Sequence, residues 1–262
     1  MTPLDHVVRL WERATEAVIG HWSRCGRLRR FAAGQWRLAR RRPLAWMTLY
    51  AFGVAAFSYV ALDRPLAWWF KAHVTGEFEG FWKTVTTLGL AAVWLVPSGV
   101  LWVMVMLAWR AAPTLEIRAR LGRIAWVPGF FVLAMAASGL LNTLVKILVG
   151  RTRPLALFTD GTYGFAPFTH AYITNSLPSG HSQAAFAAMT ALTLILPRYD
   201  IAFIAIAVLV AASRVLTSVH FLSDAVLGAW LGTFVTLAVH RLLTRRGIDV
   251  RLRFERDKRL AG

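Results

Sequence analysis

The sequence predicts an all-α, polytopic membrane protein in which six transmembrane helices form one bundle. Hydrophobic residues make up 57% of the 262 residues, and the mean hydropathy of +0.51 is well above that of a soluble domain. Six apolar runs each approach the roughly 20 residues that cross a bilayer core. They cover residues 44–62, 89–109, 124–149, 179–197, 201–219 and 225–243.

A soluble bundle of unusually buried helices is the alternative, but six such runs leave little polar sequence to cover them. The first run begins after 42 residues, too late for a cleavable signal, so we expect a retained anchor. No repeat or flexible linker divides the chain. We therefore expect one membrane domain over residues 43–243, flanked by basic tails at residues 1–42 and 244–262.

Basic residues fall mainly on one side of this predicted bundle. The net charge is +17, and 23 of the 30 Lys and Arg residues lie in residues 1–42, 110–123, Arg198 and residues 241–262. The positive-inside rule makes that side cytoplasmic, with both termini inside. This placement favours the anionic inner leaflet, not nucleic acid, as the partner of the basic tails. Apolar residues at helical spacing between Leu4 and Trp22 indicate a helix on that leaflet, or else a solvated tail that only sets orientation.

Three polar motifs interrupt the apolar pattern, each at the end of an apolar run. They are Lys-x6-Arg-Pro at residues 146–154, Pro-Ser-Gly-His at residues 178–181 and Ser-Arg-x5-His-x3-Asp at residues 213–224. Charged groups at membrane depth are costly, so a set of them marks a functional site. Following the chain through six spans brings all three motifs to the non-cytoplasmic face.

The cations in these motifs suit an anionic cluster of oxygens. Lys146 and Arg153 are two helical turns apart, so they can share a helix face. Arg153 offers a planar fork and Lys146 a compact charge. A lysine that merely reaches for the membrane edge is the alternative for Lys146. Ser179 and Gly180 open a helix, where free N–H groups and the helix dipole favour an anion.

The histidines suit phosphoryl transfer. His220 and Asp224 are four residues apart, which places the carboxylate beside the imidazole on a helix. A carboxylate that holds one ring nitrogen fixes the tautomer and leaves the other nitrogen free to attack. Alone, such a pair is usually structural; beside two other polar motifs it indicates a nucleophile. His181 suits a proton donor.

Together these motifs resemble the three signatures of the type 2 phosphatidic acid phosphatase (PAP2) superfamily, and all are present without substitution. The resemblance implies the helical core that PAP2 enzymes share with vanadate haloperoxidases, and metal-independent hydrolysis of a lipid phosphate or lipid pyrophosphate. It implies that His220 becomes phosphohistidine, that Asp224 orients it and that His181 protonates the leaving alkoxide. The phosphate ligands that it implies are Lys146, Arg153, Ser179, Gly180 and Arg214.

Several questions stay open at this stage. Arg151 lies two residues before Arg153, where it contacts either a second phosphate of a pyrophosphate or lipid headgroups. A lipid-to-lipid phosphotransferase of the same superfamily is the alternative function, whereas a transporter or scaffold does not explain His220 beside Asp224. The headgroup and the oligomeric state are not determined by these patterns.

We expect no cofactor and no metal, because the remaining histidines are scattered without ligand spacing. The strong bias towards Arg over Lys is typical of a GC-rich bacterial genome, and the chain has no Asn-x-Ser/Thr site. We therefore expect a bacterial inner membrane protein whose site faces the periplasm or exterior.

Overall fold

The computed structural model describes residues 34–35, 41–169 and 171–252. The chain falls into two units, residues 1–49 and 50–262, and the site described below lies wholly within the second. Within the described ranges the chain is helical, and the only β-type pairing is an isolated bridge between Arg151 and Phe165. The predicted all-α fold is thereby confirmed. The helix expected between Leu4 and Trp22 lies outside the described residues.

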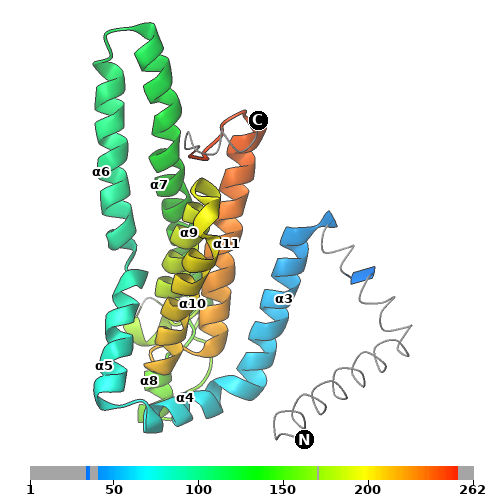
Figure 1. The fold of residues 1–262 in the computed structure, drawn as a ribbon. Helices are drawn as coiled ribbons and strands as arrows, with labels where there is room; N and C mark the ends of the chain where they lie inside the picture. Colours follow the sequence, from blue (N-terminus) through cyan, green and yellow to red (C-terminus); the bar gives the residue numbers. More distant parts are fainter. Residues whose placement is uncertain (1–33, 36–40, 170, 253–262) are drawn as a thin grey trace, which may run out of the picture. The chain divides into compact units, whose positions relative to one another are not determined.

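The described chain contains nine α-helices, and the longest connection, residues 160–179, lies between α8 and α9 (Figure 1). They are α3 (Pro43–Phe57), α4 (Asp63–His73), α5 (Gly76–Val85), α6 (Ala91–Arg110), α7 (Leu115–Val149), α8 (Pro154–Thr159), α9 (Gly180–Ile195), α10 (Asp200–Leu216) and α11 (Leu222–Arg245). Four single turns join them: η1 (Ser58–Leu62), η2 (Thr86–Gly89), η3 (Tyr172–Thr174) and η4 (Pro197–Tyr199).

Five helical stretches of the described chain are long and apolar enough to cross a membrane. They are Pro43–His73, Gly76–Arg110, Leu115–Val149, Pro197–Leu216 and Leu222–Arg245. The remaining predicted span, residues 179–197, forms α9, which is helical but only 16 residues long. It is short because Ser179 caps its start and Pro197 disfavours helix at the preceding residue. Six spans is therefore an approximate count.

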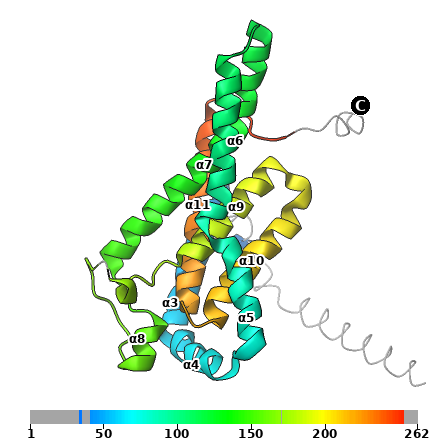
Figure 2. The same cartoon turned by 90° about the vertical axis from the view of Figure 1, so that its left-hand side faces the viewer.

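The short helix α9 packs against α7, α10 and α11, and both views place it among them (Figures 1 and 2). Its buried face is mostly alanine, which lets neighbouring backbones approach closely. Facing it, α11 carries Gly228 and Gly232. A Cβ at Gly228 would lie 2.5 Å from the carbonyl oxygen of Ser179, and one at Gly232 would lie 2.3 Å from that of Gln183. Small residues on both helices thus fix the start of α9 against α11.

The helix α7 begins earlier than the apolar pattern predicted, at Leu115 and not near residue 124. Thr114 caps it by accepting a hydrogen bond from the backbone N–H of Ile117 at 3.2 Å, and the added turns are charged and exposed. At its other end α7 stops at Gly150, whose φ of 60° suits glycine. A Cβ there would lie 1.7 Å from the carbonyl oxygen of Ala166, so this glycine lets the chain turn into the site.

Candidate active site

The three polar motifs meet at one end of the second unit. The Lys146 ammonium, at the end of α7, donates a hydrogen bond to the carbonyl oxygen of Asn175, just before the second motif. The backbone N–H of Ser179 donates to the carbonyl oxygen of Asp224 at 3.0 Å, which joins the second motif to the third. Residues that are far apart in the sequence therefore line a single polar site.

His220 and Asp224 lie side by side, with a serine between them. The Nδ1 atom of His220 is 3.7 Å from Asp224 Oδ2, too long for a direct hydrogen bond. The Ser176 hydroxyl donates to Asp224 Oδ2 at 2.6 Å and lies 3.3 Å from His220 Nδ1. The backbone N–H of Phe221 also donates to Asp224 Oδ2, at 2.9 Å. The carboxylate is thus fixed on the Nδ1 side of the imidazole, which leaves Nε2 free.

Burial keeps His220 neutral. The side chain is 3% exposed, and this desolvation lowers the pKa of His220 to about 3 although Asp224 acts in the opposite direction. The nearby charges of Arg153 and Lys146 lower the pKa further. At neutral pH the imidazole therefore carries a free lone pair, as a nucleophile requires.

Arg153 is held rigidly before any ligand binds. Its Nε donates to the carbonyl oxygen of Tyr172 at 2.9 Å, and one terminal nitrogen donates to Asn175 Oδ1 at 2.8 Å. The guanidinium also lies 4.1 Å from the centre of the Tyr172 ring. Burial lowers the pKa of Arg153, but a guanidinium stays protonated at neutral pH. The planar fork is thus oriented in advance, which reduces the cost of binding an oxyanion.

Arg214 has capacity left for a ligand. One terminal nitrogen donates to Thr86 Oγ1 at 2.8 Å, whereas its buried Nε has no partner among the described residues. The buried Asn142 Oδ1 also lacks a partner in that part of the chain. Buried polar atoms are rarely left without hydrogen bonds, so unpaired groups here indicate a position for a polar ligand or water.

The start of α9 contributes a helix N-terminus. The Ser179 hydroxyl accepts hydrogen bonds from the backbone N–H and the hydroxyl of Ser182, at 3.5 and 3.0 Å. His181 follows on the first turn and packs against Gly89 of η2. A Cβ at Gly89 would lie 2.8 Å from the Cβ of His181, so the position of His181 depends on this glycine.

Arg151 lies on the far side of Asp224 from His220's ring. It is 1% exposed, and its two terminal nitrogens donate to Asp224 Oδ1 and to Asp63 Oδ2, the latter at 2.7 Å. Burial works against its charge, but Asp224 and Asp63 outweigh that effect and raise the pKa of Arg151. A guanidinium occupied by two carboxylates has little left for a ligand, so this placement favours neither of the two alternatives, a second phosphate or lipid headgroups.

Sequence reasoning missed several partners of the site. Asp63, Asn175 and Ser176 lie outside the three motifs, yet they hold Arg151, Arg153 and Asp224. Asp63 had a signal: it is an acidic residue directly after the first apolar run, where a carboxylate is costly unless it is paired. The other two carried none, because polar residues in a loop are ordinary.

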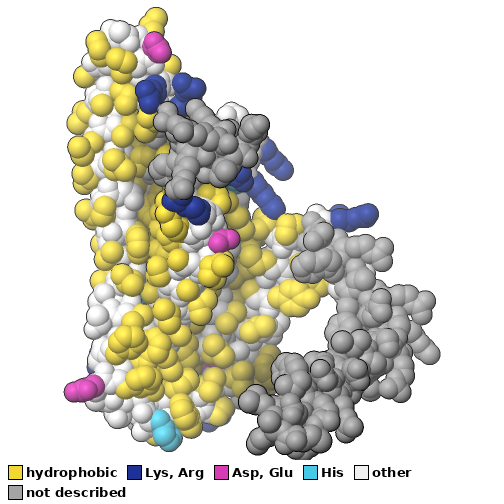
Figure 3. Space-filling view, viewed as in Figure 1, with side chains coloured by type: hydrophobic (Ala, Val, Ile, Leu, Met, Phe, Trp, Pro, Cys, Tyr) yellow, Lys and Arg dark blue, Asp and Glu magenta, His cyan; other side chains and the backbone are white. Residues whose placement is uncertain are grey.

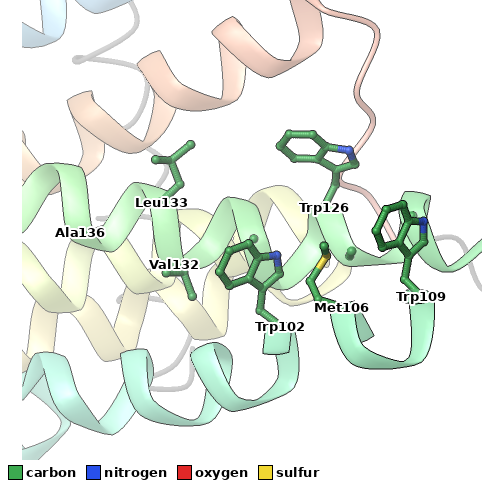
Figure 4. Close-up of a pocket in the computed structure, with 10 residues that line it drawn as sticks. Trp102, Met106, Trp109, Trp126, Val132, Leu133 and Ala136 are labelled. Atoms are coloured by element: carbon green, nitrogen blue, oxygen red, sulfur yellow. The ribbon is translucent and has the colours of Figure 1, made fainter. Parts of the chain in front are cut away.

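Two cavities differ in character. One of about 280 Å³ lies beside Arg153 and Tyr172 and is also lined by polar groups, among them Lys71 and Ser218. Another, of about 600 Å³, lies between α6 and α7 and is lined by tryptophans and aliphatic side chains (Figure 4). The larger cavity has no charged group in its lining and does not suit a phosphate. The smaller, polar cavity adjoins the candidate site, because Arg153 is part of its lining.

Comparison with known proteins gives consistent matches. The family model described as the PAP2 superfamily matches residues 128–248. Proteins called lipid A 1-phosphatase from Rhizobium johnstonii and Rhizobium etli are each 27% identical over 212 residues, 80% of this chain and 86% and 90% of theirs. The crystal structure of a transmembrane PAP2 type phosphatidylglycerolphosphate phosphatase from Bacillus subtilis shares the fold with a TM-score of 0.54. It is 24% identical, and the match covers 77% of this chain and 96% of that one.

Proposed function

Because this chain carries a PAP2-superfamily domain over residues 128–248, we propose that it is a membrane phosphatase that hydrolyses a lipid phosphate or lipid pyrophosphate. One observation carries the proposal. A neutral, buried His220 backed by Asp224 lies in the same site as three cations and a helix N-terminus. The three cations are Lys146, Arg153 and Arg214.

The geometry supports a two-step reaction. Nε2 of His220 attacks phosphorus, the bond from phosphorus to the lipid oxygen breaks, and His181 donates a proton to that oxygen. The cations and the N-terminus of α9 offset the charge on the phosphoryl oxygens. Water then attacks the phosphohistidine, His181 takes its proton, and phosphate leaves with His220 restored.

The substrate is a lipid whose phosphate lies at the membrane surface. Two relatives are called lipid A 1-phosphatase, which makes a phosphate on the sugar of lipid A the first substrate to test. The lipid-to-lipid phosphotransferase stays the alternative, because the same phosphohistidine can pass its phosphoryl group to a lipid hydroxyl. Adding an acceptor lipid and analysing the products separates the two.

The site is proposed to face the periplasm or exterior of a bacterial inner membrane, with both termini cytoplasmic. The basic segments 110–123 and 241–246 lie towards the end of the bundle opposite the motifs, where Figure 3 shows blue side chains gathering. Single cysteines at the exposed positions Thr162 and Ala111, with Cys25 changed to Ser, report this in intact cells. An impermeant thiol reagent should label position 162 and not 111; the reverse would place the site in the cytoplasm.

The activity test uses purified protein and a panel of lipids: phosphatidate, phosphatidylglycerol phosphate, a polyprenyl pyrophosphate and lipid A. Release of inorganic phosphate is measured with excess EDTA, and His220→Ala is the control. We expect release from at least one lipid by the wild-type protein and none by His220→Ala, because no nearby side chain replaces the nucleophile. A His220→Ala variant with a tenth of the wild-type rate would refute the phosphohistidine, and loss with EDTA would refute metal independence.

A further inference from the structure

Behind the nucleophile lies a buried network of charges that reaches outside the three motifs. Asp63, the first residue of α4, accepts hydrogen bonds from Arg151 at 2.7 Å and from the backbone N–H of Ser223 at 3.1 Å. The Ser223 hydroxyl also donates to Asp63. Arg151 in turn donates to Asp224. Asp63, Arg151 and Asp224 are each at most 1% exposed, so solvent does not screen these contacts.

Aromatic rings enclose the guanidinium of this network. The Arg151 guanidinium carbon lies 5.0, 5.5 and 4.6 Å from the ring centres of Tyr59, Tyr163 and Phe221. The Tyr163 hydroxyl accepts from Arg151 at 3.2 Å and donates to the carbonyl oxygen of Tyr59 at 2.7 Å. The cation is therefore fixed on its faces as well as at its ends.

We propose that Asp63 and Arg151 are positioning residues for the His220–Asp224 pair: Asp63 holds Arg151, and Arg151 keeps Asp224 ionised and directed at His220. This inference rests on the proposed function. It assigns Arg151 a role behind the nucleophile in place of a contact with a second phosphate. It also gives Asp63, which lies 88 residues before Arg151, a part in the reaction.

The charge balance of the network gives the proposal its test. Asp63 and Asp224 share one guanidinium, and without it two buried carboxylates would face each other across Ser223. Two buried carboxylates that have lost the guanidinium between them do not both stay ionised, so one of them would bind a proton. A protonated Asp224 no longer places a negative charge beside the His220 ring, which becomes positive when its Nε2 bonds to phosphorus. The titratable and charged groups around Asp224 are His220, Arg151, Asp63, Tyr163, Arg153 and Lys146.

Three variants separate positioning from packing: Arg151→Met, Asp63→Asn and the double variant. Turnover of a lipid monophosphate, a lipid pyrophosphate and a soluble aryl phosphate is measured from pH 5 to 9. We expect Arg151→Met to lose on the order of 10²-fold in rate at pH 7, less than the roughly 10⁴-fold lost when the carboxylate that orients a catalytic histidine is itself replaced. Its activity should recover as pH rises, because Asp224 ionises again.

The double variant distinguishes charge balance from packing. Asp63→Asn alone leaves Arg151 paired with Asp224, so we expect a loss of about tenfold or less. Adding Asp63→Asn to Arg151→Met removes the like charge facing Asp224. The double variant should therefore be more active at pH 7, and melt at a higher temperature, than Arg151→Met alone. A role limited to packing predicts the opposite order for both quantities.

Three results would overturn the proposal: a double variant no better than Arg151→Met, a pH profile of Arg151→Met that matches the wild type, or a loss confined to the pyrophosphate. The last would restore the second-phosphate contact. Failure of the proposed function looks different. Wild-type protein would then be inactive on every lipid, while the order of melting temperatures would still test whether Arg151 balances the two carboxylates.

Discussion

Changing Gly228 to alanine should impair catalysis although this residue touches no substrate. The glycine lies on α11 where that helix meets the first turn of α9. An added Cβ would lie 2.5 Å from the Ser179 carbonyl oxygen, 3.2 Å from Ser182 Cβ and 3.3 Å from the Gln183 nitrogen. Ordinary contact begins at 3.4 Å, so the Ser179 carbonyl must retreat by about 0.9 Å. The atoms that meet the methyl group are largely backbone, which cannot rotate away.

That shift moves the helix N-terminus relative to the nucleophile. The backbone N–H of Ser179 donates a hydrogen bond to the backbone carbonyl oxygen of Asp224. A displaced Ser179 therefore changes the distance between the phosphate-binding turn and the His220–Asp224 pair. A misplacement of about 1 Å can cost roughly 10²-fold in rate. We therefore expect Gly228→Ala to lose on the order of 10²-fold, about 2.7 kcal/mol in the barrier.

The assay compares phosphate release per folded molecule, with folding judged by melting temperature and gel filtration in detergent. Gly139→Ala on α7 is the matched control, because a Cβ there meets nothing within 4 Å. It should keep wild-type activity. If Gly228→Ala kept more than half of the wild-type rate per folded molecule, the contact between Gly228 and Ser179 would not set the active geometry.

Three further substitutions test individual roles. His181→Ala should slow turnover of a lipid alkoxide far more than that of an activated aryl phosphate, because only the poor leaving group needs a proton; equal losses would leave His181 as a phosphate ligand. Lys146→Arg should lower the rate roughly 10²-fold although the charge is kept, because the longer guanidinium does not fit the compact site. A near-wild-type rate would show that Lys146 only reaches for the membrane edge. Asp224→Asn should cost on the order of 10²–10⁴-fold on every substrate, and a smaller loss would mean that Ser176 alone orients His220.

The sequence predicted that the three polar motifs share one face of the bundle, and in the structure hydrogen bonds join them, although Asp63, Asn175 and Ser176 were not predicted. Charged side chains at the ends of apolar runs are informative because the bilayer makes their cost high, and chain direction then decides which ends share a face. The same argument predicted the helical fold. It failed at helix ends: α7 begins at Leu115, where charged residues continue a capped helix, and hydropathy does not report a charged extension.

The roles of Arg151 and Asp63 could not be predicted in the same way. The position of Asp63 directly after an apolar run indicates that it is paired, but nothing in the spacing says that its partner lies 88 residues later. Only the folded chain shows that η1 and α4 place Asp63 within hydrogen-bonding distance of Arg151. The sequence hypothesis for Arg151 left open a second phosphate or lipid headgroups, whereas the turn after Gly150 directs its guanidinium to Asp63 and that of Arg153 to Asn175.

The charges of the site explain why a buried, neutral histidine suits it. Lys146, Arg153, Arg214 and Arg151 supply four positive charges, and Asp63 and Asp224 supply two negative ones. Apart from the proton that His181 donates to the leaving oxygen, the excess of two matches a phosphate monoester dianion, whose charge is about −1.5 to −2 at neutral pH. A protonated His220 would add a third unit and remove the lone pair that attacks phosphorus. Burial lowers the pKa of His220 and prevents this, so one physical cause both preserves the nucleophile and keeps the charge balance for a dianion.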